Sequence, residues 1–151
     1  MSKSTIYFDR HFGHWAYPVH RWLYQHTGGR IGGHSPMGPM LLLTTKGAKS
    51  GKEHTSPVMY LADEHDSTLV YVFASYAGAD VNPAWYHNLL ANSYDVIVEV
   101  GVETVPATAE VLDEPRRTAI YTEQIRRVPG FAEYQAKTTR TIPVVELKLR
   151  N

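Results

Sequence analysis

Short apolar runs alternate with polar turns along the chain, and this pattern predicts an antiparallel sheet with a few helices. Six runs are rich in Leu, Val, Ile, Tyr and Thr, and turn residues bound most of them, which is typical of strands. They cover residues 40–45, 55–61, 68–75, 96–100, 105–111 and 142–149. Six strands with two or three helices predict an α+β fold, in which a small β-barrel carries the helices on its outside.

Two segments between these runs show the signals of helix starts and stops. Asn82 and Pro83 are typical of a helix start, with Asn82 as the N-cap and Pro83 in the first helical position. A later helix is predicted from residues 113–115 to about residue 128, where the Pro-Gly pair at residues 129–130 ends it.

The N-terminal part of the chain differs in composition from the rest. Between residues 7 and 27, aromatic side chains recur at helical spacing, with a break at Pro18, and residues 28–39 are rich in glycine and proline. We therefore expect an aromatic helical segment with a loop at residues 1–39 and a barrel domain at residues 40–151. Such a helix could cover the core, rest on a membrane surface or contact a partner, and all three remain open.

Composition and charge exclude several classes of function. Lys+Arg and Asp+Glu number 15 each, so no net field attracts the chain to nucleic acid. The absence of cysteine excludes disulfides, a thiol nucleophile and Cys-ligated zinc. The eight histidines lack the spacing of a zinc motif, so no metal site is predicted. Neither a signal peptide nor a membrane-spanning run is evident, and a cytoplasmic location is expected, with membrane association left open by the N-terminal segment.

The most informative motif is a cationic turn, residues 46–54, between the first two predicted strands. It contains Lys46, Lys49, Lys52, His54 and two glycines. Glycines allow a positive φ, which can aim successive N–H groups in one direction, and lysines add positive charge. This combination suits a phosphate or another polyanionic group. The spacing is not that of a nucleotide-binding P-loop, and an ordinary solvated hairpin tip is the alternative.

A second motif joins a predicted strand to the helix that follows it. Small residues after residue 73 would let a flat ring approach the backbone, and Ser75 offers a hydroxyl group. The helix N-terminus offers N–H donors and a positive potential. Trp85 and Asn88 lie three apart on one helix face, either beside a ligand or as an ordinary core residue and a polar neighbour.

In their order along the chain, these segments resemble the deazaflavin-dependent nitroreductase family of actinobacteria, which includes F-420-dependent quinone and enone reductases. The segments that match the family's order are residues 42–45, 47–51, 56–57, 74–75, 82–89, 91–92, 134–135 and 140–145.

The resemblance implies a split β-barrel and coenzyme F-420, a deazaflavin that carries a phosphate and an oligoglutamate tail. It implies an oxidoreductase that transfers hydride from the reduced deazaflavin to an electron-poor acceptor such as an enone, quinone, lactone or nitro compound. A non-catalytic F-420 carrier and an FMN- or haem-binding barrel are the alternatives. Related split barrels often dimerise, so a homodimer is considered beside a monomer.

The resemblance also assigns cofactor-binding residues. Lys49 matches the family's phosphate- and tail-binding lysine, and Ser50 and Gly51 match its backbone cradle. His54 stands where many members carry arginine, which implies a weaker or pH-dependent contact. The remaining matches lie near the deazaflavin ring, and they are Pro57, Ser75, Trp85 and Asn88.

Two aromatic residues are implied at the substrate wall. Tyr134 matches a tyrosine of that wall, and Phe131 replaces a tyrosine found in nitroimidazole-reducing members, which suggests a more apolar acceptor. Ser75, Tyr134 or a water molecule could polarise or protonate the acceptor, so Ser75 and Tyr134 are the catalytic candidates.

Overall fold

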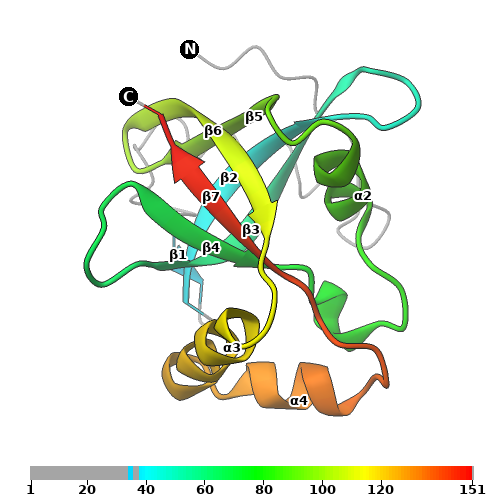
Figure 1. The fold of residues 1–151 in the computed structure, drawn as a ribbon, viewed down its shortest axis with the longest axis vertical. Coiled ribbons are helices and arrows are strands. Elements are labelled where there is room, and N and C mark those ends of the chain that lie inside the picture. Colours follow the sequence, from blue (N-terminus) through cyan, green and yellow to red (C-terminus); the bar gives the residue numbers. More distant parts are fainter. Residues whose placement is uncertain (1–33, 36–37, 151) are drawn as a thin grey trace.

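In the computed structural model, which describes residues 34–35 and 38–150, six antiparallel strands close into a barrel (Figure 1). The strands are β2 (Gly38–Lys46), β3 (Glu53–Ala62), β4 (Leu69–Phe73), β5 (Val96–Val100), β6 (Glu103–Val111) and β7 (Val144–Leu149). They pair in the order β2-β3-β4-β7-β6-β5, and β5 pairs back with β2 through Leu43 and Val98. The predicted α+β split barrel is confirmed.

Alternation along the strands divides the buried side chains between two clusters. On β4, Val70 and Val72 pack with Leu41, Leu43 and other strand residues in one cluster. Tyr71 and Phe73, which alternate with these valines, belong to a second cluster that includes residues of the helices. Successive side chains of a strand point to opposite faces, so β3, β4 and β7 contribute to both clusters.

Three α-helices lie outside the barrel within the described residues, as predicted. They are α2 (Ala84–Ala91), α3 (Arg116–Arg127) and α4 (Gly130–Ala136), and a 3-10 turn, η1 (Tyr76–Gly78), precedes α2. Figure 1 shows α3 and α4 together at one end of the barrel, while α2 lies near the connection between β2 and β3. None of the helices in this part of the chain is long and apolar enough to cross a membrane.

The predicted start of α2 was wrong by one residue. Pro83 is the N-cap in an extended conformation, with ψ of 157°, and Ala84 is the first helical residue. The Asn82 side chain contacts a distant residue instead, because its oxygen accepts a hydrogen bond from Arg140 Nη1 at 2.6 Å. A long-range contact has thus replaced the local cap that the sequence suggested.

Other boundaries were also refined by tertiary contacts. The predicted loop at residues 28–39 contains β1 (His34–Ser35), which pairs with the first two residues of β2. The predicted break at residues 129–130 is confirmed, but the segment beyond it is α4. The helix expected at residues 7–27 lies outside the described residues, and the proposed division at residue 39 stays a prediction.

Candidate functional site

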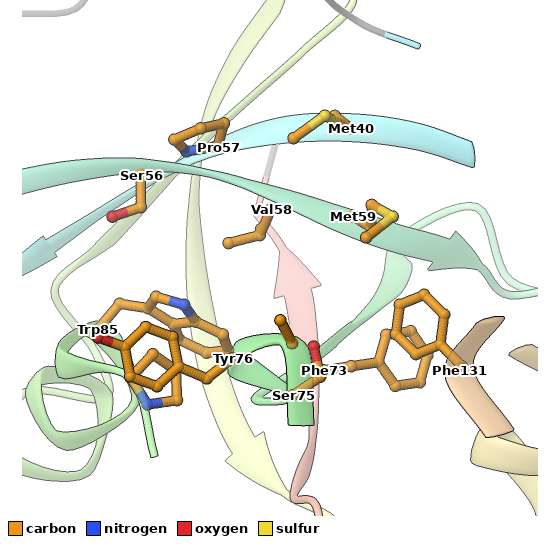
Figure 2. Close-up of a pocket in the computed structure, with 12 residues that line it drawn as sticks. Met40, Ser56, Pro57, Val58, Met59, Phe73, Ser75, Tyr76, Trp85 and Phe131 are labelled. Atoms are coloured by element: carbon orange, nitrogen blue, oxygen red, sulfur yellow. The ribbon is translucent and has the colours of Figure 1, made fainter. Parts of the chain in front are cut away.

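A cavity of about 280 Å³ lies beside β3, between the start of α2 and the start of α4 (Figure 2). Its walls are mostly apolar or aromatic. The lining residues are Met40, Ser56, Pro57, Val58, Met59, Phe73, Ser75, Tyr76, Ala77, Pro83, Trp85 and Phe131. Concave sites with apolar walls and few polar groups are typical of pockets for small molecules and cofactors.

The two ends of this cavity have different side chains. Figure 2 shows Trp85 and Tyr76 at one end, and Met59 and Phe131 at the other, with Ser75 between them. A flat ring could therefore lie against indole and phenol groups at the first end. The second end offers an aromatic ring and flexible thioethers, which adapt to ligands of different shapes.

Ser75 occupies the position where β4 has ended and η1 begins. It is buried, and its carbonyl oxygen accepts hydrogen bonds from the Gly78 N–H at 2.8 Å and from Arg140 Nη2 at 3.0 Å. The next two residues, Tyr76 and Ala77, have φ values of 48° and 55°. Left-handed backbone is costly for residues other than glycine, and such strain is concentrated at functional sites.

The cationic turn is closed by its own backbone. The Gly47 N–H donates to the Lys52 carbonyl at 2.8 Å, and the Gly51 N–H donates to the Gly47 carbonyl at 3.0 Å. Gly51 has a φ of 69°, which glycine adopts without steric cost. Lys49 and Ser50 are exposed at the tip and do not line the cavity. The predicted tail-binding residues are therefore together, at a separate place from Pro57, Ser75 and Trp85, which line the cavity.

Helix α2 connects this turn with the cavity. Asn88 Oδ1 accepts from the Ala48 N–H at 3.0 Å, and Asn88 Nδ2 donates to Thr45 Oγ1 at 3.2 Å. One turn of helix before it, Trp85 lines the cavity. Trp85 and Asn88 share a buried face, as the spacing predicted. The side-chain amide of Asn88 is used to hold the turn in place.

His54 lies against the inside of the cationic turn. A Cβ atom placed on Gly47 would be 2.9 Å from His54 Nε2, so only glycine fits this position without a shift. Burial, and then the positive charge of Lys52, lowers the pKa of His54 from its ordinary value of 6.5. The neutral imidazole is therefore favoured near neutral pH, and acid would add a positive charge to the turn.

Phe131 and Tyr134 lie on α4, on the same side of the barrel as the cavity. Phe131 is 1% exposed, lines the cavity and contacts Phe73 edge-on at 5.4 Å between ring centroids. Tyr134 is half-buried and packs against Phe131 at 5.1 Å, behind the cavity wall. The structure brings Pro57, Ser75, Trp85 and Phe131 together around the cavity.

Sequence reasoning missed several wall residues. Met40 and Met59 are opposite each other in the register of β2 and β3. The tight turn between these strands was recognised, and counting outward from it along both strands would have paired the two methionines. Tyr76 and Ala77 gave no comparable signal, because neither residue favours the left-handed conformation. Within the described residues, no group of three acidic or histidine side chains could hold a metal ion.

Comparisons with known proteins agree with this geometry. The family model described as F420H(2)-dependent quinone reductase matches residues 16–148. An F420H(2)-dependent quinone reductase of Mycobacterium tuberculosis is 36% identical over 148 residues, which cover 94% of this chain and 95% of the relative. A solved structure of an F420-H2 dependent reductase has 36% identity and a TM-score of 0.65, covering 73% of this chain and 94% of its own. Another solved chain, described as a domain-swapped dimer, has 31% identity and a TM-score of 0.67, covering 89% and 97%.

Proposed function

The chain belongs to the F420H(2)-dependent quinone reductase family, and we propose that its cavity holds the deazaflavin ring of coenzyme F-420 beside an electron-poor acceptor. It is an F-420-dependent oxidoreductase, for which the bound reduced cofactor supplies the hydride. The observation that carries the assignment of the site is the pairing of an apolar cavity with a cationic turn through a single helix, α2.

The donor set of the chain fits this cofactor. A deazaflavin needs an apolar slot for its ring and positive charge for its phosphate and carboxylates. Trp85 and Pro57 provide apolar wall, and the exposed Lys49 and Lys52 provide charge. Lys52 precedes Pro57 by five residues, which is roughly 17 Å along an extended strand. A ligand with a ring at one end and an anionic tail at the other could occupy both places at once.

We assign the acceptor to the end of the cavity formed by Met40, Met59 and Phe131. Apolar and polarisable walls suit the ring of a quinone, and unbranched methionines adapt to rings of different width. A hydrogen bond to the acceptor oxygen is stronger beside such apolar walls than in water.

Ser75 is our first candidate for polarising or protonating the acceptor. It is buried, it lines the cavity and it lies between the two ends. Its hydroxyl can donate to an oxygen on which negative charge develops. Tyr134 supports Phe131 from behind, and its direct contact with the acceptor stays a prediction.

Parallel equilibrium titration with F-420 and FMN tests the cofactor. We expect F-420 to bind at least ~10-fold more tightly, a difference of about 1.4 kcal/mol. FMN affinity equal to or greater than that of F-420 would favour a flavin barrel instead. Addition of a quinone to the reduced complex then separates a reductase from a carrier, because only a reductase reoxidises the cofactor in an acceptor-dependent way.

We further propose that the protein acts in the cytoplasm as a homodimer that touches a membrane surface through residues 7–27. The relative described as a domain-swapped dimer supports the homodimer. The aromatic composition of the N-terminal segment supports the membrane contact. Sedimentation velocity measures the oligomeric state. Co-sedimentation with anionic vesicles, compared with a variant that lacks residues 1–33, measures the membrane contact.

A further inference from the structure

Arg140 makes an unusual number of hydrogen bonds to a single loop. This loop, residues 74–82, connects β4 with α2. The guanidinium donates to the carbonyl oxygens of Ala79 at 2.8 Å, Ser75 at 3.0 Å and Ala74 at 3.1 Å, and to Asn82 Oδ1 at 2.6 Å. Arginine carries five N–H donors in a planar fork, and no other side chain in proteins can donate to so many acceptors at once.

The loop that Arg140 holds carries the strained part of the cavity wall. Tyr76 and Ala77 have positive φ values, and both line the cavity beside Ser75. An alanine or tyrosine in isolation would return to the right-handed or extended region. The left-handed turn therefore persists because surrounding contacts fix it at both ends. Arg140 binds on both sides of the turn, at Ser75 and at Ala79.

Helix α4 closes over the same turn from the other side. A Cβ atom on Gly78 would lie 2.8 Å from the Tyr134 carbonyl oxygen, and the φ of Gly78 is 84°. The loop and α4 are thus in close backbone contact. Arg140 is connected with α4 as well, because its carbonyl oxygen accepts from Gln135 Nε2 at 2.7 Å. The loop that carries Ser75 and the helix that carries Phe131, two residues of the cavity wall, are thus joined through Arg140.

We propose that Arg140 is a positioning residue for the reductase reaction, which holds the left-handed turn at Tyr76 and Ala77 and so sets where the Ser75 hydroxyl stands between cofactor and acceptor. Arg140 does not line the cavity, so its proposed role needs no contact with either reactant. The inference rests on the proposed function for its catalytic consequence. The mechanical part, that Arg140 fixes the turn, concerns the protein alone.

Hydrogen exchange in the cofactor-free protein tests the mechanical part. The Gly78 N–H donates to the Ser75 carbonyl, and the Ala79 N–H donates to the Tyr76 carbonyl at 3.1 Å, so both amides report on the turn. Arg140→Lys keeps the charge but loses the fork. We expect exchange at these two amides to accelerate at least about tenfold. Unchanged exchange would overturn the proposal.

Turnover tests the catalytic part. Arg140→Lys should lower kcat for quinone reduction about tenfold to a hundredfold per folded enzyme, because small displacements of a reacting group are costly. The visible circular dichroism of bound F-420 should change with it, because that signal reports how the ring lies in its chiral surroundings. Faster exchange with kcat unchanged would overturn the positioning role.

A rescue variant separates positioning from general stability. Glycine adopts left-handed conformations freely, so Ala77→Gly should restore the turn in the Arg140→Lys background. We expect the double variant to recover kcat about fivefold or more over Arg140→Lys, with slower exchange at Gly78. A double variant no more active than Arg140→Lys would contradict the proposal. If Arg140→Lys does not fold, Asn82→Ala is the substitute, because it removes only the bond between Asn82 Oδ1 and Arg140. It should accelerate exchange at Gly78 and Ala79 and lower kcat, each by about twofold to fivefold.

Arg117→Lys is the matched control. Arg117 also binds the C-terminal segment, through Nε to the Ile142 carbonyl at 2.9 Å and Nη2 to Gln135 Oε1 at 2.9 Å, but makes no bond to the loop at residues 74–82. The Arg117→Lys variant should therefore have a lower unfolding temperature and an unchanged kcat per folded enzyme. An equal loss of kcat in both variants would show a general effect of destabilisation. Failure of the wild type to bind F-420 would refute the proposed function, whereas the exchange experiment would still decide whether Arg140 fixes the turn.

Discussion

The cationic turn and the cavity wall are held in place by different kinds of contact. The turn is closed by bonds between near neighbours, such as that from the Gly51 N–H to the Gly47 carbonyl. The wall around Ser75 depends on Arg140, whose partners in this loop are at least 58 positions away in the sequence. The turn is therefore closed locally and anchored to α2 through Asn88, whereas the wall around Ser75 is held by a residue far along the chain. The two regions should respond differently to substitution.

The largest expected effect is on chemistry at the cavity wall. Ser75→Ala removes the hydroxyl that we propose to lie between cofactor and acceptor, and it should lower kcat about 10²- to 10³-fold, as loss of one donor to a developing oxyanion does. Affinity for F-420 should be unchanged, because the tail contacts remain. Steady-state kinetics with saturating reduced F-420 and one quinone measures kcat, and equilibrium titration measures the affinity for F-420.

The exposed hydroxyl of Ser67, in the turn between β3 and β4, supplies the matched control. Ser67→Ala should leave kcat as it is. If Ser75→Ala keeps the kcat of the wild type, Ser75 neither polarises nor protonates the acceptor, and another group supplies the proton.

At the cationic turn the expected effect is on binding. Lys49→Ala removes one charge-assisted contact, which costs roughly 1.5–3 kcal/mol and should weaken F-420 binding about tenfold to a hundredfold. The loss should shrink for a deazaflavin without phosphate and tail. Lys148→Ala, an exposed lysine on β7, is the control and should bind as the wild type does. If Lys49→Ala binds F-420 as tightly as the wild type, Lys49 does not contact the anionic tail and the turn is an ordinary hairpin tip.

Asn88 tests the connection between the two regions. Asn88→Ala leaves the Ala48 N–H and Thr45 Oγ1 without their partner, and the loss at the buried Thr45 hydroxyl costs about 1–3 kcal/mol. We expect a lower unfolding temperature together with a weakening of F-420 binding of about fivefold. Loss of stability alone, with binding intact, would mean that the turn keeps its shape without α2.

The smallest expected effect is a pH dependence at His54. Its pKa in the folded protein is lowered, so binding of the anionic tail should strengthen about twofold to fivefold as the pH falls below about 6.5 and the imidazole gains charge. Stability should change in the opposite sense. The unfolded chain takes up the proton first, so folding weakens as the pH falls through this range. His54→Gln should abolish both trends, and a pH dependence that persists in this variant would assign them to another group.

Several elements could be read from the sequence because the cause was local. Runs such as residues 40–45 and 96–100 had the composition of strands, and both are strands in the structure. Helix α3 ends just before the Pro-Gly pair at residues 129–130, as predicted. The glycines of the cationic turn also stand where the backbone needs them.

What the sequence could not show depended on distant partners. The cap of α2 was assigned to Asn82, but Arg140 binds its side chain. The left-handed turn at Tyr76 and Ala77 opposes their intrinsic preference, and only the packed loop maintains it. Pro57, Ser75, Trp85 and Phe131 were identified through family resemblance, and the packing of the loop after β4, α2 and α4 beside β3 brings them around one cavity.

Met40 and Met59 have a consequence for divergence within the family. They are cross-strand neighbours on β2 and β3, and they line the part of the cavity that we propose for the acceptor. Methionine tolerates replacement by other apolar residues of similar volume with little loss of stability. After gene duplication, one substitution at either position could change which acceptors fit while the anchor for the cofactor stayed intact. Copies of this gene could therefore acquire new acceptors in single steps.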